Sequence, residues 1–184
     1  GLTKPKGAPG VLERLAIRLA ALQRTDRPRA ENVRIILFAG DHGITAQGVS
    51  AYPSAVTVQM LENFARGGAA ICVLARDLGA PLEVVDAGTL AASEIAGVAT
   101  DKPCRGTRDF SREQAMTTGE DEHALMTGRR AALRAADHRA DLLILGEMGI
   151  GNTTSAAAIA AALLARPPAD LAGAGTGLDA KGVR

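Results

Sequence analysis

The stretch LLILGEMGIGNTTSAAAIAAAL, from Leu142 to Leu163, is the part of the sequence that decides the fold. A short run of apolar residues leads into a glycine-rich turn, and the turn leads into a run dominated by alanine. Such an apolar run ending in glycine is typical of a buried parallel strand, and alanine is the strongest helix former. The stretch therefore predicts a strand at 141–146 and a helix at 153–165, with Asn152 or Thr153 as its N-cap.

The same alternation of strand and helix patterns continues elsewhere in the chain. Branched apolar runs predict strands at Val33–Gly40 and Leu82–Gly88. Helical patterns occupy residues 57–79, broken near Gly67 and Gly68, and about 113–138, whereas residues 89–111 lack a period and predict a loop with at most a short strand. Strands that alternate with helices predict an α/β fold, a Rossmann-like doubly wound parallel sheet with helices on both faces.

A small helical part precedes this sheet. Its apolar stripe predicts an amphipathic helix and consists of Leu12, Leu15, Leu19 and Leu22. A polar connector follows, so we divide the chain into a helical segment at 1–30 and an α/β domain at 31–184. The first residue is not methionine and the last residues follow a glycine loop, so we expect both ends to be cut.

Composition excludes several classes of protein. The chain has 184 residues, of which 47% are hydrophobic and 2% aromatic, with a formal net charge of +1. No basic arm stands out, so we expect no nucleic-acid partner. The apolar runs are too short to span a bilayer and the N-terminus lacks the apolar core of a secretory signal, so we expect a cytoplasmic protein. Cys72 and Cys104, far apart in sequence, are expected to be reduced thiols.

The glycine turn after the strand at 141–146 is suited to an anion. Gly146, Gly149 and Gly151 can take positive φ angles and can let a ligand approach the backbone. The free N–H groups of the helix that follows, with the hydroxyls of residues 153–155, would form a neutral anion site. The turn matches neither the Walker nor the Rossmann glycine motif. The alternative is a tight strand–helix turn with no ligand.

Glu147 lies beside this anion site, where a carboxylate would repel phosphate. The combination suits a bifunctional ligand, with phosphate on the amides and a group of positive character near the glutamate. A ribose 5-phosphate with developing positive charge at its anomeric carbon meets both demands. The alternative is that Glu147 faces only solvent.

Three other features supplement this site. Asp41 and His42 follow a predicted strand and could form an acid–base pair, or Asp41 could cap the turn and bind His42. A zinc site would need further ligands, and His123 and His138 lack the spacing, so we expect no metal. The loop Gly173–Gly177 resembles a second anion or sugar clamp, with Lys181 nearby. Tyr52 and Met60 could wall a flat aromatic substrate or belong to the core.

Taken together, these motifs resemble a known family. The segments that carry the resemblance include FAGDHGITAQGVSAYPSAVTVQML, RGGAAICVLAR, VVDAG, GEMGIGNTTSAAA and GAGTGL, in the family's order. The family is nicotinate-nucleotide:dimethylbenzimidazole phosphoribosyltransferase, of cobalamin nucleotide-loop assembly. The resemblance covers nearly the whole chain, and the pairing of GEMGIGNTT with DHG and GVSAYP is specific.

The resemblance implies a reaction, a set of partners and a site. Phosphoribose would move from nicotinate mononucleotide to 5,6-dimethylbenzimidazole, giving α-ribazole 5′-phosphate and nicotinate, without a cofactor and in a homodimer. Glu147 would face the ribose, and residues 31–184 would form the phosphoribosyl-binding domain. The implied substrate-binding residues are Asp41, His42, Tyr52, Gln59, Met60, Gly149, Gly151, Asn152, Thr153, Thr154, Gly175, Thr176 and Gly177.

One part of the family pattern falls outside this sequence. In the family the general base is a glutamate in the carboxyl-terminal part, beyond the position of Arg184. We therefore expect the 184-residue chain alone to be inactive or severely impaired, with an unpaired sheet edge. Two alternatives stay open: a module that binds a nucleotide without turnover, and a phosphate-binding hydrolase that uses Asp41 and His42.

Overall fold

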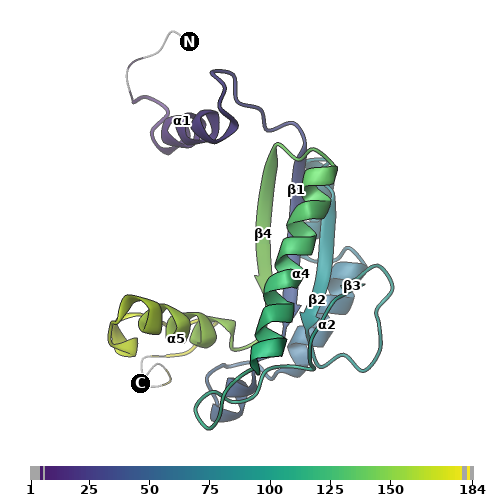
Figure 1. Ribbon diagram of the computed structural model, residues 1–184, viewed down its shortest axis with the longest axis vertical. Helices are drawn as coiled ribbons and strands as arrows, with labels where there is room; N and C mark the ends of the chain where they lie inside the picture. The colour runs from purple at the N-terminus through teal and green to yellow at the C-terminus, as the bar shows by residue number, and fades with distance from the viewer. Residues whose placement is uncertain (1–4, 6, 180–181, 183–184) are drawn as a thin grey trace.

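The structure, a computed structural model, describes residues 5, 7–179 and 182. In this part of the chain, a four-stranded sheet has the order β3-β2-β1-β4, and every pairing is parallel (Figure 1). The strands are β1 (Val33–Gly40), β2 (Leu82–Gly88), β3 (Ala99–Thr100) and β4 (Leu142–Met148). The predicted parallel sheet is therefore confirmed, and β3 is the short strand within the predicted loop.

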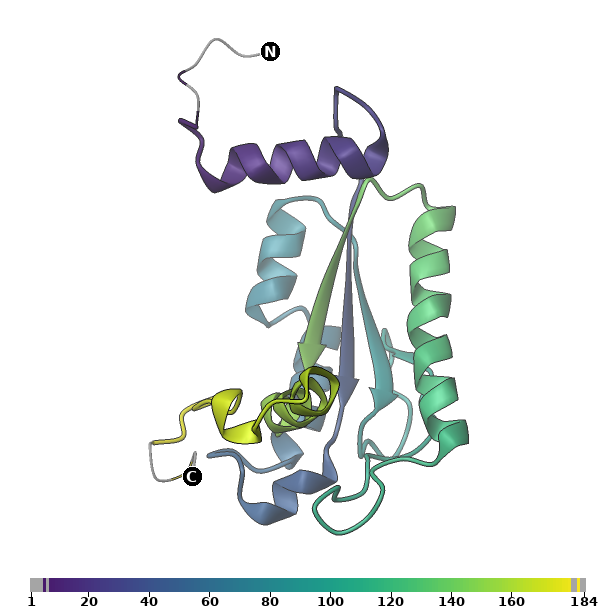
Figure 2. The same ribbon diagram turned by 60° about the vertical axis from the view of Figure 1, so that its left-hand side comes forward.

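Helices cover both faces of the sheet, as predicted (Figure 2). α2 (Ala55–Ala65) and α3 (Ala70–Asp77) lie on one face, and α4 (Thr118–Asp137) lies on the other. α5 (Asn152–Leu164) follows β4 directly and projects from the carboxyl ends of the strands, next to the short helices η1 (Gly43–Gln47) and η2 (Pro168–Asp170). The break between α2 and α3 falls at the two predicted glycines.

Alternate residues of β1 supply the core on both faces. Leu37 and Ala39 pack with Leu61 and Phe64 of α2, whereas Ile36 packs on the other face with small residues of α4. Those small residues are Ala131 and Ala135, which are almost fully buried. The core is thus mainly aliphatic, with Phe64 as a buried aromatic residue and alanine at the contact with α4, which agrees with the scarcity of aromatic residues.

α4 begins five residues later than the pattern at 113–138 predicted, at Thr118. Thr117 and Glu120 form a capping box, in which Thr117 Oγ1 accepts from the Glu120 amide at 3.3 Å and Glu120 Oε2 accepts from the Thr117 amide at 2.6 Å. Arg108 also binds Glu120, and this hydrogen bond is the largest cause that lowers the pKa of Glu120 to about 2. Residues 108–117 are therefore fixed as a loop.

α1 (Val11–Gln23) forms the predicted N-terminal helix beyond the amino ends of the strands (Figure 1). Its leucine stripe is not buried: Leu12, Leu15 and Leu22 are all exposed. The helix end is tied to the sheet by Gln23, whose Nε2 donates to the Asp141 carbonyl at 3.0 Å. Leu145 of β4 is also 66% exposed, in agreement with the expected open sheet edge.

A buried ion pair fixes the carboxyl end of β2. Lys102 Nζ donates to Asp86 Oδ2 at 2.7 Å and to the carbonyls of Thr89 and Ala91, both at 3.2 Å. The side chains of Lys102 and Asp86 are 16% and 3% exposed. Asp86 Oδ1 accepts the amides of Gly88 and Thr89, so the carboxylate is fully used in ordering the turn after β2.

We predict that Lys102→Ala lowers the free energy of unfolding by about 3–5 kcal/mol, because the Asp86 carboxylate would stay buried without its cation. Denaturant unfolding followed by circular dichroism measures the change. The matched control is Arg66→Ala, which removes the ion pair that Arg66 forms with Glu62 four residues earlier. The side chains of Arg66 and Glu62 are 72% and 49% exposed. The control should cost no more than about 1 kcal/mol. Equal losses in the two variants would contradict the prediction.

Candidate functional site

The carboxyl ends of β1 and β4 bring together residues far apart in sequence. Asp41 and His42 follow β1 directly, and Glu147 lies near the end of β4, in register with Phe38. In open parallel sheets, ligands bind beyond the carboxyl ends of the strands. The candidate site therefore lies between these two strand ends and the first turn of α5.

Gly149 is required where the two strands end. A Cβ atom on Gly149 would lie 2.3 Å from the Gly40 carbonyl oxygen, 2.9 Å from Glu147 Oε1 and 3.0 Å from His42 Nε2. Of the three glycines of the turn, only Gly151 uses a positive φ, of 87°, and Gly146 and Gly149 do not. Steric exclusion, not backbone freedom, explains Gly149.

Glu147 is held by the residue that opens α5. Asn152 Nδ2 donates to Glu147 Oε2, and Asn152 Oδ1 accepts the Thr153 amide at 2.7 Å. Asn152 therefore lies inside the helix, and the N-cap is Gly151, one residue before the predicted cap. Glu147 is exposed as a residue, so the predicted alternative that it faces solvent holds in part. Partial desolvation of its carboxyl group raises the pKa of Glu147 above its usual value, and the Asn152 hydrogen bond opposes that rise.

His42 makes its hydrogen bond to α5. Its Nδ1 lies 3.0 Å from Ser155 Oγ, so the predicted alternative of a hydrogen bond from His42 to Asp41 was wrong. Burial is the largest cause that lowers the pKa of His42, and the charge of Asp41 opposes it. The imidazole is therefore neutral at neutral pH.

Asp41 organises the loops around this imidazole. Its Oδ2 accepts the Leu90 amide at 2.8 Å and its carbonyl accepts the Thr107 amide at 3.0 Å. The residue is 3% exposed, and its Oδ1 is buried without a hydrogen-bond partner in the described structure. Asp41 thus ties the end of β1 to the loops after β2 and β3.

Most amides of the glycine turn are already used within the protein. The Asn152 amide donates to the Gly149 carbonyl at 3.0 Å, the Thr154 amide donates to the Gly151 carbonyl at 3.2 Å, and the Ile150 amide donates to Thr57 Oγ1 at 3.1 Å. The expectation of free N–H groups at the start of α5 was therefore wrong for this conformation. The hydroxyls of Thr153 and Thr154 are the polar groups of the first turn that reach a cavity.

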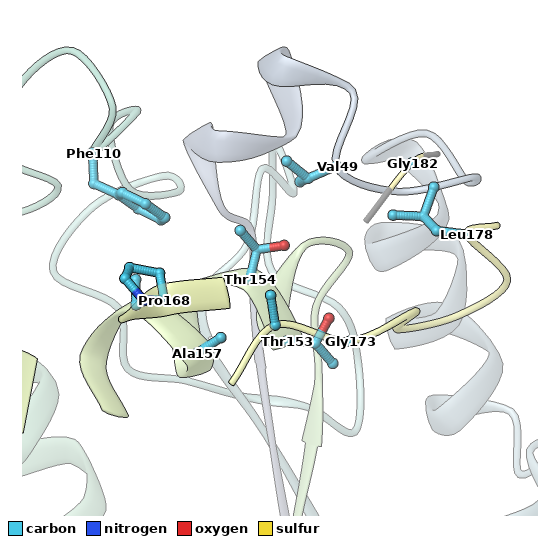
Figure 3. Close-up of a pocket in the computed structure, with 11 residues that line it drawn as sticks. Val49, Phe110, Thr153, Thr154, Ala157, Pro168, Gly173, Leu178 and Gly182 are labelled. Atoms are coloured by element: carbon cyan, nitrogen blue, oxygen red, sulfur yellow. The ribbon is translucent and has the colours of Figure 1, made fainter. Parts of the chain in front are cut away.

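A cavity of about 270 Å³ lies beside the first turn of α5 (Figure 3). Its walls are mainly apolar, and Thr153 and Thr154 supply the hydroxyls. The lining residues are Val49, Phe110, Thr153, Thr154, Ala157, Ala158, Pro168, Ala172, Gly173, Leu178 and Gly182. The loop Gly173–Gly177 is brought to the same helix turn, since a Cβ on Gly175 would lie 2.9 Å from Thr153 Oγ1.

The segment from Tyr52 to Met60, which was expected to hold an aromatic base, does not bring its predicted side chains together at the turn that contains Glu147. Tyr52 is 51% exposed in a turn, Gln59 is exposed on α2, and Met60 packs against the core cluster that contains Leu37. In the described structure none of the three side chains hydrogen-bonds to the turn at Glu147. α2 contributes Thr57 instead, a fully buried residue that no sequence signal marked.

Sequence reasoning also missed Val49 and Phe110, two walls of the cavity. Phe110 lies at the end of a segment without a regular pattern. Aromatic residues make up only 2% of the chain, so each of them could have been considered as a possible wall of a binding site. Gly177, with φ 92°, has open space around it, and Lys181 lies outside the described residues.

Metal-ligating side chains do not gather in the described ranges. His123 binds Asp101 at 2.9 Å instead of approaching His42, and no group of three or more His, Cys, Asp or Glu side chains there could hold a metal ion. The same residues contain no helix that is both long and apolar enough to cross a bilayer.

Comparisons with known proteins identify the class. A family model described as phosphoribosyltransferase matches residues 1–184. The chain is 67% identical over 181 residues to the nicotinate-nucleotide--dimethylbenzimidazole phosphoribosyltransferase of Bradyrhizobium sp. (strain ORS 278), covering 98% of this chain and 52% of that protein. It is 57% identical over 184 residues to the protein of the same name from Pseudomonas putida (strain GB-1), covering 100% of this chain and 52% of the relative.

Solved structures agree with this result. The crystal structure of CobT from Thermus thermophilus superimposes with a TM-score of 0.92 at 47% identity, covering 100% of this chain and 55% of that chain. The fold is that of an α/β protein with a parallel sheet, and the candidate site lies at the carboxyl ends of its strands. The chain belongs to the nicotinate-nucleotide--dimethylbenzimidazole phosphoribosyltransferase family, and it spans about half the length of the relatives it matches.

We predict that Gly149→Ala lowers the free energy of unfolding by about 1–3 kcal/mol, since the new methyl group would overlap the Gly40 carbonyl. Gly128→Ala is the control, because Gly128 lies within α4 with open space at its Cβ position. That substitution should stabilise the protein by about 1 kcal/mol through helix propensity. Thermal unfolding of both variants checks the pair, and an unchanged melting temperature for Gly149→Ala would contradict the steric argument.

Proposed function

We propose that the protein transfers phosphoribose from nicotinate mononucleotide to 5,6-dimethylbenzimidazole, giving α-ribazole 5′-phosphate and nicotinate. The observation that carries the proposal is the fixed position of Glu147. Asn152 holds this carboxylate next to the first turn of α5, whose threonine hydroxyls line the cavity. The relatives named above carry the name of this reaction.

The chemistry requires little from the protein at the leaving group. The C1′–N bond of a pyridinium nucleotide breaks with its electron pair passing to nitrogen, so nicotinate leaves with a neutral ring and needs no acid. The benzimidazole nitrogen forms the new bond to C1′, and the base then loses its N–H proton. The protein has to hold the phosphate, stabilise the positive charge that develops on the sugar, and accept that proton.

The residues of this chain divide these tasks between them. Glu147 faces the electron-poor sugar carbon and stabilises it electrostatically. The hydroxyls of Thr153 and Thr154, with the loop Gly173–Gly177 that packs on them, hold the phosphate. Because the Asn152 and Thr154 amides are already used, the hydroxyls are the first donors that phosphate meets. Of those two amides, Thr154 has the longer hydrogen bond, at 3.2 Å, and is the easier one to exchange.

The remaining substrate contacts are part of the same proposal. The base lies against the apolar wall of Val49 and Phe110 and toward the segment from Tyr52 to Met60. The proton goes to a glutamate of the carboxyl-terminal part of the family, beyond the position of Arg184. The 184-residue chain by itself is accordingly inactive or severely impaired in this proposal.

The assembly and location follow the family resemblance. We propose a homodimer in the cytoplasm. The exposed leucines of α1 form an apolar surface of the kind that a folded protein normally covers, which supports an association of this kind. Sedimentation of the full-length polypeptide measures its mass, and a monomer would overturn the dimer.

A non-catalytic nucleotide-binding module is the second candidate, because the threonine hydroxyls of α5 and the loop Gly173–Gly177 would bind a nucleotide equally well without turnover. The hydrolase hypothesis is weaker, since His42 binds Ser155 and not Asp41. Turnover separates the candidates: the full-length polypeptide with both substrates in metal-free buffer should form α-ribazole 5′-phosphate. Binding of nicotinate mononucleotide without any product would favour the module.

We predict that Glu147→Gln lowers kcat/KM by about 10²–10³-fold in the full-length polypeptide, the usual effect of removing one preorganised electrostatic group. The loss should fall on kcat, because the positive charge moves from the pyridinium ring to the sugar, which Glu147 faces, only as the C1′–N bond breaks. Steady-state kinetics with both substrates measures it.

Glu62→Gln on α2 is the matched control. Glu62 forms an exposed ion pair with Arg66, so its substitution should leave the kinetics unchanged. An unchanged kcat/KM for Glu147→Gln would remove Glu147 from the mechanism while leaving the binding proposal intact.

A further inference from the structure

The two nitrogens of the His42 ring meet different surroundings. Nδ1 lies 3.0 Å from the Ser155 hydroxyl oxygen. Nε2 lies 3.0 Å from the point where a Gly149 Cβ would stand, and the Gly40 carbonyl oxygen and Glu147 Oε1 lie 2.3 Å and 2.9 Å from the same point. Nε2 thus faces a small space shared with two oxygen acceptors.

These surroundings select one form of the neutral ring. A neutral imidazole carries one N–H and one lone pair. A proton on Nε2 provides a donor toward the Gly40 carbonyl and the Glu147 carboxylate, while Ser155 donates its hydroxyl proton to Nδ1. The opposite tautomer would place the Nε2 lone pair against two groups that only accept, and it would be disfavoured.

We propose that His42 is a positioning residue that acts through Glu147. Ser155 fixes the His42 ring so that its Nε2–H donates toward the Glu147 carboxylate. This donor holds the carboxylate ionised and facing the ribose. The role at the ribose rests on the proposed phosphoribosyl transfer. The tautomer of His42 and its effect on Glu147 rest only on the geometry around the ring. No direct hydrogen bond joins the two side chains in the described structure, and such bonds often shorten only when substrate binds.

Glu147 has few other charged neighbours. From the β1 side, His42 and Asp41 are the titratable groups near it, and Asp41 is engaged with the Leu90 amide. From α5, the uncharged side chain of Asn152 binds the carboxylate, and the uncharged side chain of Ser155 binds His42. The His42 donor is therefore the main adjustable influence on the carboxylate besides Asn152.

The direction of the effect follows from which form the donor favours. A donor to a carboxylate stabilises its ionised form and lowers its pKa, so loss of that donor raises the pKa of Glu147 further. Activity that requires ionised Glu147 is present above this pKa and is lost below it. Without the His42 donor, the acidic limb of the pH profile of kcat/KM therefore moves to higher pH.

The tautomer can be tested without turnover. Nitrogen-15 NMR of the histidine side chains in the full-length polypeptide should show His42 as a neutral ring protonated at Nε2, assigned by its disappearance in a His42 variant. Ser155→Ala should bring in the second tautomer. A ring protonated at Nδ1, or one that is charged at neutral pH, would overturn the proposal whatever reaction the protein performs.

Two substitutions at His42 test the effect on Glu147. The amide nitrogen of glutamine can reach the place of Nε2, whereas the amide of asparagine reaches only the place of Nδ1. His42→Asn should lose about 10–100-fold in kcat/KM, the value of one hydrogen bond to a charged group, and its acidic limb should move to higher pH. His42→Gln should recover most of the activity and the original limb.

The outcomes are distinguishable. Equal losses in both variants with an unmoved acidic limb would mean that His42 only packs, and would overturn the inference. If the unmodified polypeptide forms no α-ribazole 5′-phosphate, the proposed function fails, and the inference is then decided by the NMR tautomer and by a carbon-13 titration of Glu147. An unchanged pKa of Glu147 in His42→Asn would overturn it in that case as well.

Discussion

The close approach of two strand ends is the constraint on which the site depends. β1 and β4 pair in register from Val33 opposite Leu142 to Ala39 opposite Met148, so the chain leaves the sheet at Gly40 and Gly149 side by side. A methyl group at Gly149 would stand 2.3 Å from the Gly40 carbonyl oxygen, so any other residue there would require the backbone to shift. This packing brings Glu147 from one strand and His42 from the other to the same small space, which neither strand could create alone.

Much of this arrangement could be predicted from the sequence, because apolar runs that end in glycine mark parallel strands locally. The two strands at Val33–Gly40 and Leu82–Gly88 have the predicted bounds. The start of α4 could not be placed from periodicity, since it is set by a capping box at Thr117 and by Arg108, twelve residues before Glu120. The strand order could not be predicted either, because pairing depends on contacts between distant segments.

The errors within the site have the same origin. Free amides were expected at the start of α5 because an isolated helix leaves its first N–H groups unpaired. Thr57, 93 residues before Ile150, accepts one amide of the turn, and the Asn152 side chain accepts another while its nitrogen holds Glu147. His42 likewise finds Ser155, 113 residues away. The long-range partners Thr57 and Ser155 leave no local pattern in the sequence. The bonds of Asn152 are local, but the sequence does not show which way its side chain turns.

Desolvation shifts the pKa values of Glu147 and His42 in opposite directions, because in both cases it disfavours the charged form. Burial raises the pKa of Glu147 and lowers that of His42, so the protein by itself disfavours charge on both. In the proposed transfer, positive charge that develops on the sugar would oppose this effect for the carboxylate, because it would supply the counter-charge that Glu147 lacks. The attraction is then greater for the transition state than for the neutral ground-state sugar, which is the condition for an interaction to raise the rate and not only the affinity.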